Sequence, residues 1–219
     1  MKRIRLGVFG VGRGIHIAES FLLLDCDIVA LCDFHPERLE KASKALGGTA
    51  AVTQEFEDGA AGLGYHVMRL KGKSRYETNL AILAEAGVNT TDEVLIATGT
   101  NYADSLSASA TGLPMLLVAD SLTAEQREFL QGTSRNFVIL GGTGAVSEAV
   151  EAELDAMGDV TRVKGSSRYG TSVAIAQRYF VSPEAAVLAY AEGFPDGLCG
   201  GPLAMAMGAP LILTSDDNY

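Results

Sequence analysis

An internal duplication constrains this sequence more than any other feature. Residues 47–52 (Gly-Gly-Thr-Ala-Ala-Val) return as residues 141–146 (Gly-Gly-Thr-Gly-Ala-Val), 94 positions later. Residues 72–78 (Gly-Lys-Ser-Arg-Tyr-Glu-Thr) return as residues 165–171 (Gly-Ser-Ser-Arg-Tyr-Gly-Thr), 93 positions later. Self-similarity at a nearly fixed period is typical of repeat architectures, so the fold has to accommodate two copies of one structural unit.

Two further blocks support the duplication. Residues 101–106 (Asn-Tyr-Ala-Asp-Ser-Leu) match residues 193–198 (Gly-Phe-Pro-Asp-Gly-Leu) at an offset of 92. Residues 113–117 (Leu-Pro-Met-Leu-Leu) match residues 209–213 (Ala-Pro-Leu-Ile-Leu) at an offset of 96. All the blocks occur in the same order in both copies, and the small drift in offset indicates short insertions between them.

Within one copy, helical and strand-like stretches alternate. The apolar patterns predict helices over 78–86, 105–111 and 121–130, the last opened by a cap at Ser121. Short apolar runs predict buried strands over 94–97, 115–118 and 137–140. Short apolar strands separated by helices favour a parallel, three-layer α/β unit. The uncharged run 197–215 contains four glycines and two prolines, and is interpreted as helix, loop and strand.

Residues 1–46 carry a different pattern. Residues 4–9 and 28–32 predict two strands, each followed by apolar residues at helical spacing, with Pro36 in the first turn of the second helix. The resulting β-α-β-α order is a Rossmann-like or flavodoxin-like half unit. The fold class is therefore α/β, with three-layer parallel sheets in this half unit and in the tandem repeats behind it.

The glycine turn of this half unit raises the possibility of dinucleotide binding. Gly10, Gly12 and Gly14 would lie against a pyrophosphate, and Asp33, 23 residues after Gly10, would bind a ribose. Ile15 occupies the third glycine position of the G-x-G-x-x-G pattern. The segment resembles the N-terminus of glucose–fructose oxidoreductase/inositol dehydrogenase-type enzymes, which implies NAD or NADP as cofactor. A purely structural glycine turn is the alternative.

Composition limits the function classes. The chain has 219 residues with 47% hydrophobic content, enough to bury one large or two small cores. Lys and Arg number 17 against 27 Asp and Glu, a formal net charge of −10, which argues against a general nucleic-acid binder. The three cysteines show no metal-binding spacing. The histidines are scattered, so we expect neither a catalytic set nor a metal site.

The repeated blocks resemble the cell-wall-binding repeat (type 2) of Gram-positive surface proteins. Its four hallmarks are the Gly-x-x-Arg-Tyr-x-Thr turn, the strand followed by Asp and Leu, the Pro-Ile-Leu-Leu-like strand and Gly-Gly-Thr-x-Ala-Val. The resemblance covers residues 47–219 and implies a non-catalytic module that anchors a surface protein to an anionic cell-wall polysaccharide. It predicts domains at 1–46, 47–158 and 159–219.

Basic residues recur at one place in each repeat, against an acidic background. They are the candidate polymer-binding residues, together with the neighbouring tyrosines: Arg69, Lys71, Lys73, Arg75, Tyr76, Arg162, Lys164, Arg168 and Tyr169. The alternative is that these are charged edge strands, with each Arg-Tyr pair packed structurally and its arginine paired to Asp104 or Asp196. For these two aspartates we favour a helix N-cap role.

Two other functions stay open at this point. The chain could be a nicotinamide-dependent oxidoreductase fragment, or an engineered chimera without a selected function. As written it carries no signal peptide and no membrane span, which favours a cytoplasmic chain, whereas the family resemblance implies the cell wall or surface. Assembly into a homo-oligomer is compatible with the sequence.

Overall fold

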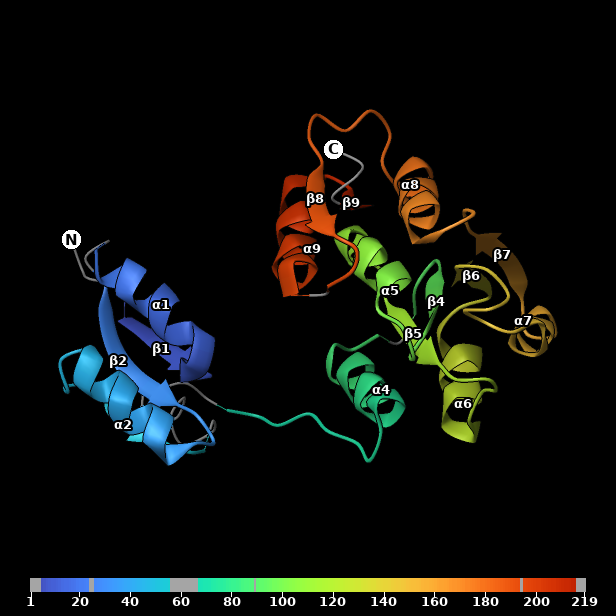
Figure 1. The fold of residues 1–219 in the computed structure, drawn as a ribbon. Helices are drawn as coiled ribbons and strands as arrows, with labels where there is room; N and C mark the ends of the chain where they lie inside the picture. The colour runs from blue at the N-terminus through green and yellow to red at the C-terminus, as the bar shows by residue number, and fades with distance from the viewer. Residues whose placement is uncertain (1–4, 24–25, 56–66, 89, 194, 216–219) are drawn as a thin grey trace. The chain divides into compact units, whose positions relative to one another are not determined.

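The computed structural model describes residues 5–23, 26–55, 67–88, 90–193 and 195–215 (Figure 1). The chain divides into two compact units, Met1–Arg69 and Leu70–Tyr219. The mixed α/β class with parallel sheets is confirmed in both units. The domain boundaries expected after residues 46 and 158 stay predictions. No helix in the described ranges combines the length and apolarity that crossing a membrane requires.

The first unit is a small parallel sheet with helices packed on it. Its order is β1 (Arg5–Phe9), α1 (Val11–Leu22), β2 (Asp27–Cys32), α2 (Pro36–Ala45) and β3 (Ala51–Thr53). The strands lie in the order β1-β2-β3, all parallel. Leu31 and Leu39 are among the buried residues that join the sheet to the helices. The expected β-α-β-α order is confirmed.

The second unit is built on a four-stranded parallel sheet. The strands are β4 (Val94–Thr98), β5 (Met115–Val118), β6 (Asn136–Leu140) and β7 (Asp159–Val163), in the order β5-β4-β6-β7. Helices α4 (Arg75–Glu85), α6 (Ala124–Thr133) and α7 (Glu148–Asp155) bury their apolar residues against one face of this sheet. Helices α5 (Ala103–Ala108) and α8 (Arg168–Tyr179) cover the other face. The expected three layers are confirmed.

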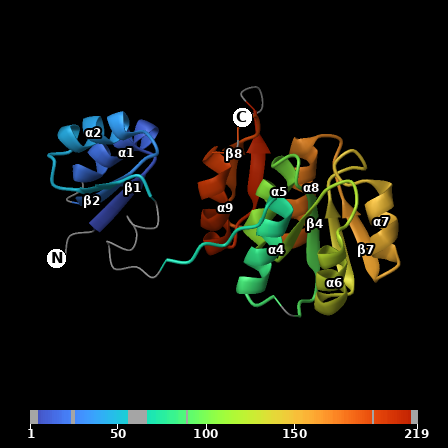
Figure 2. The same cartoon turned by 90° about the horizontal axis from the view of Figure 1, so that it is seen from below.

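A second, two-stranded sheet completes this unit. β8 (Val187–Tyr190) and β9 (Leu211–Thr214) are parallel, and α9 (Pro195–Met207) connects them. α9 packs against α5, as Figures 1 and 2 show, and it also packs against the short 3-10 helix η1 (Ser109–Thr111). A side chain at Gly201 would overlap Ser109, so glycine permits this close approach.

The sequence repeats and the sheets are out of phase. With the expected boundary after residue 158, β7 belongs to the second copy of the repeat, yet β7 pairs with β6 of the first copy, from Asn136↔Asp159 to Leu140↔Val163. α8 also belongs to the second copy, and its Ile175 is buried in the core on one face of the four-stranded sheet. The equivalent segment 69–71 of the first copy forms no strand in the structure. The two repeats therefore share one core.

Two expected helix caps are wrong. Helix α6 begins at Ala124, and its cap is Thr123, which forms a capping box with Gln126, rather than Ser121. Asp104 lies within the first turn of α5 instead of capping it. The N–H of Ala103, the first residue of α5, donates to the Oδ1 atom of Asn101 at 3.1 Å, which takes over the role expected of Asp104.

Candidate functional site

Both copies of the Gly-x-Ser-Arg-Tyr-x-Thr motif build the same helix start. The Oγ atom of Ser74 accepts the N–H of the third residue of α4 at 3.2 Å. The Oγ1 atom of Thr78 accepts the N–H of Gly72 at 2.9 Å. Ser167 and Thr171 make the equivalent hydrogen bonds at the start of α8, at 3.3 and 3.1 Å. The serine bonds satisfy N–H groups that a helix start otherwise leaves unpaired, and the threonine bonds fix the glycine that precedes each helix.

Replacing Ser167 with alanine should lower the free energy of unfolding by about 1 kcal/mol, because the cap of α8 is lost. Urea unfolding of the full chain measures the change. Ser166→Ala is the matched control, since Ser166 is exposed and caps no helix, and it should leave stability unchanged. Equal losses in the two variants would contradict the capping role.

The Arg-Tyr pairs contact the loops that follow β4 and β8. The Nη1 atom of Arg75 donates to the carbonyl oxygen of Gly99, and a side chain at Gly99 would overlap the ring of Tyr76. In the second repeat, the Nη1 atom of Arg168 donates to the carbonyl oxygen of Ala191 at 2.9 Å. Each arginine of an Arg-Tyr pair therefore has a structural contact, in which its partner is a backbone carbonyl group.

The second pair makes an additional contact with an acid. Arg168 lies 3.3 Å from a carboxylate oxygen of Glu192, and the hydroxyl of Tyr169 donates to the other oxygen at 2.9 Å. Arg168 also acts electrostatically on Asp104 of the preceding repeat, where its charge opposes the rise that burial causes in the pKa of that carboxyl. The side chain of Asp196 lies outside the described part of the structure, so its expected pairing and capping stay predictions.

The basic segments separate into internal and surface side chains. Arg162 on the edge strand β7 is only 9% exposed and is bound to Glu151 at 2.7 Å. Its guanidinium also donates to the carbonyl oxygens of Gly141 and Val146, at 3.0 and 3.1 Å. Of the other basic residues in the two segments, Arg168 is half-buried, and the exposed ones are Arg69, Lys71, Lys73, Arg75 and Lys164. Polymer binding by the nine candidate residues stays a prediction.

A cleft of about 430 Å³ lies at the carboxyl ends of β4, β6 and β7. Its lining comes from three segments that follow these strands, within residues 98–104, 142–145 and 165–171. Asp104 contributes a carboxyl group that is half-buried, and burial raises its pKa. Gly141 has φ +89°, and a side chain there would overlap the carboxylate of Asp104. The Gly-Gly-Thr and Asp hallmarks therefore meet in space.

Sequence reasoning identified only part of this cleft. Thr98, Thr100 and Asn101 were not singled out, because no motif marks a polar residue at the end of a buried strand. The available signal was positional, since the carboxyl ends of parallel strands are where α/β sheets bind ligands. Residues of both repeats line the cleft. Aligning one copy of the repeat with the other does not show that these residues lie close together.

In the first unit, the structure places the candidate cofactor residues around the turn between β1 and α1. Gly10 has φ +84°, and its N–H donates to the carbonyl oxygen of Cys32 at 2.8 Å. Asp33 is 8% exposed and accepts the N–H of His35 at 3.0 Å. That hydrogen bond, with smaller contributions from the positive charge of Arg38 and the N–H of Gly12, lowers the pKa of Asp33. Gly14 lies in α1. Binding of NAD or NADP there stays a prediction.

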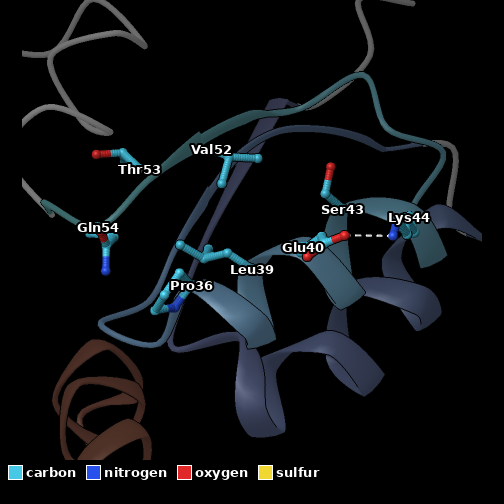
Figure 3. A pocket seen from close by; sticks show the side chains of 8 residues that line it. All are labelled: Pro36, Leu39, Glu40, Ser43, Lys44, Val52, Thr53 and Gln54. Atoms are coloured by element: carbon cyan, nitrogen blue, oxygen red, sulfur yellow. Dashed lines mark hydrogen bonds and ion pairs between the residues drawn. The ribbon is translucent and has the colours of Figure 1, made fainter.

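A pocket in the described part of the first unit lies away from this turn. Figure 3 shows a pocket of about 530 Å³ between α2 and β3, where Leu39 and Val52 lie on facing elements. The Nζ atom of Lys44 lies 2.6 Å from a carboxylate oxygen of Glu40 at its rim. None of the four candidate cofactor residues lines this pocket. It therefore adds no support to the dinucleotide hypothesis.

Comparison with known families assigns the repeats. The family described as Cell wall binding domain 2 matches residues 69–151 and 162–219. The second match begins at Arg162, inside β7, as the out-of-phase arrangement requires. The resemblance of residues 1–46 to glucose–fructose oxidoreductase-type enzymes finds no support in the comparisons.

Two curated proteins of Bacillus subtilis (strain 168) are similar in sequence. The N-acetylmuramoyl-L-alanine amidase LytC is 28% identical over 179 residues, which cover 79% of this chain and 35% of the amidase. The amidase enhancer is 23% identical over 192 residues, which cover 86% of this chain and 26% of that protein. The chain therefore spans about a third or less of the length of the curated relatives it matches.

Two solved structures from Clostridium difficile are similar in fold. Cwp8 matches with a TM-score of 0.67 and 24% identity, over 97% of this chain and 40% of Cwp8. Cwp6 matches with a TM-score of 0.69 and 20% identity, over 98% of this chain and 38% of Cwp6. At these identities the likeness supports the fold class of the chain.

Proposed function

Because the chain belongs to the Cell wall binding domain 2 family, we propose that its repeats form a non-catalytic module that holds a larger protein on an anionic cell-wall polysaccharide. The family match carries the proposal, since it covers more than half of the chain. The amidase and the amidase enhancer support it, because each is a longer protein that contains a similar segment. Location at the cell surface follows from this proposal.

The surface charges support an anionic partner. Lys71, Lys73 and Lys164 are exposed beside the two Arg-Tyr turns, in a chain whose net charge is −10. A lysine presents a point charge to a phosphate or carboxylate, and several weak contacts along one polymer add up through effective concentration. The guanidinium of Arg162, by contrast, is already bound to Glu151 and to two carbonyl groups, so we leave Arg162 out of the proposed contact surface.

Replacing Lys71, Lys73 and Lys164 together with glutamine should weaken binding to isolated Gram-positive cell walls. We expect roughly a tenfold loss of affinity at low ionic strength, from about 0.5 kcal/mol per exposed charge. The loss should shrink at 0.5 M salt, where exposed charges are screened. Sedimentation of the full chain with walls, at several salt concentrations, measures both effects.

A charge-matched variant controls for the change in net charge. Lys41→Gln/Lys44→Gln/Arg135→Gln also removes three positive charges, at exposed positions outside the basic segments. It should bind walls as well as the unmodified chain does. Equal weakening in both triple variants would contradict a specific role for the three lysines, and unchanged binding in both would remove them from the contact surface.

A further inference from the structure

The cleft at the carboxyl ends of β4, β6 and β7 contains an acid that accepts no hydrogen bond from the described part of the chain. The carboxylate of Asp104 projects from α5 and lies against Gly141, whose missing side chain leaves room for it. Within the described residues, no donor forms a hydrogen bond with this carboxylate, and Arg168 acts on it through its charge. The carboxylate of this half-buried residue is therefore available to accept hydrogen bonds from a ligand in the cleft.

Apart from the guanidinium of Arg168, the polar groups that line the cleft with Asp104 are uncharged. The hydroxyls of Thr98 and Thr100 lie 2.8 Å apart at the end of β4, beside Asn101. Gly142 and Gly144, from the loop after β6, also line the cleft. Hydroxyl and amide groups combine donors with acceptors, as a polyhydroxylated ligand requires.

The cleft is less suited to a phosphate. Its guanidinium, from Arg168, already donates to the carbonyl oxygen of Ala191 and lies 3.3 Å from the carboxylate of Glu192. A phosphate would also enter beside the carboxylate of Asp104, and like charges in a partly buried site repel strongly. A neutral sugar avoids this repulsion, since its adjacent hydroxyls donate to a carboxylate in charge-assisted hydrogen bonds.

We propose that this cleft binds one neutral sugar residue of the wall polymer, whose hydroxyl groups donate to Asp104 while Thr98, Thr100 and Asn101 surround the ring. The inference rests on the proposed function for the presence of a polymer. It adds a second mode of contact, in which the exposed lysines attract the anionic groups and the cleft selects a sugar. The cleft needs both repeats, because Asp104 comes from the first and Arg168 from the second.

Titration of the ¹⁵N-labelled full chain with neutral monosaccharides tests the proposal. The probes are glucose, N-acetylglucosamine and N-acetylmannosamine, with inorganic phosphate for comparison, and the readout is the amide resonances of Gly142, Gly144 and Ser166. We expect saturable shifts with at least one sugar, unchanged by 0.5 M salt. Asp104→Asn should weaken that binding about tenfold or more, because a charge-assisted hydrogen bond is lost.

Asp155→Asn, on the exposed side of α7, is the matched control and should bind sugar normally. Resonances that respond to no sugar would overturn the inference, as would phosphate binding that Asp104→Asn leaves intact or strengthens. The wall-sedimentation assay separates the two proposals. If the triple lysine variant no longer binds walls but still shows the sugar-induced resonance shifts, both modes of contact are supported. If the unmodified chain shows these shifts but binds no walls, only the proposed function is contradicted.

Discussion

Replacing Arg162 with alanine should lower the free energy of unfolding of the unit at residues 70–219 by about 3 kcal/mol, because a nearly buried ion pair loses one partner. The substitution leaves the Glu151 carboxylate and the carbonyl groups of Gly141 and Val146 without their donors. Urea unfolding, with hydrogen exchange at β6 and β7 to locate the effect, measures the loss. We expect no change in the first unit.

Lys164→Ala is the matched control for this substitution. Lys164 follows β7 directly but is exposed, so its removal should leave stability within about 0.5 kcal/mol of the unmodified chain. Loss of stability in Lys164→Ala equal to that in Arg162→Ala would contradict the distinction between an internal and a surface cation.

The effect of Arg162→Ala should also depend on pH. The hydrogen bonds from Arg162 lower the pKa of Glu151, so this pair contributes stability above the ordinary glutamate range. The contribution is lost as the pH falls through the lowered pKa. The difference in the free energy of unfolding between the unmodified chain and Arg162→Ala should therefore be largest near neutral pH and should decrease in acid.

Replacing Gly141 with alanine should destabilise the same unit by roughly 3 kcal/mol, from two causes that act together. At φ +89° any side chain is strained, and the added methyl group would overlap the carboxylate of Asp104. Chemical unfolding of the full chain measures the total. Hydrogen exchange should show the largest loss of protection at the carboxyl ends of β4 and β6, where the two residues meet.

The neighbouring glycine provides the control. Gly142 has no positive φ, and a methyl group there would meet nothing within 4 Å, so Gly142→Ala should be close to neutral. Adding Asp104→Ala to Gly141→Ala should relieve the overlap and leave the backbone strain. Strictly additive losses in the double variant would contradict the proposed contact between these two residues.

The secondary structure of this chain was largely predictable because the signals are local. The strand at 115–118 has the same bounds in prediction and structure, and the strands at 94–97 and 137–140 differ by one residue. Apolar runs bounded by turn residues determine such elements. The cap of α6 was wrong because Ser121 and Thr123 are both good capping residues, and only Thr123 has glutamine at the position that completes a capping box.

The candidate site was less predictable because it depends on strand order. Asp104 and Gly141 meet only because β4 and β6 are neighbours in the sheet, and nothing local in the sequence specifies that neighbourhood. The same applies to Arg162, which looked like a surface cation on an edge strand. Its position on β7 is an edge position, yet α7 lies close enough for Glu151 to pair with it.

The offset between repeat and sheet has a consequence for how such arrays unfold and how they can be divided. A cut in the chain at the boundary between the two family matches would separate β6 from β7 and expose the face that Ile175 covers. Unfolding of one repeat would therefore disrupt the sheet and the core of the other. We expect residues 70–219 to unfold in a single cooperative step. Because β7 of the second repeat pairs with β6 of the first, the junction between the two repeats is part of one continuous sheet.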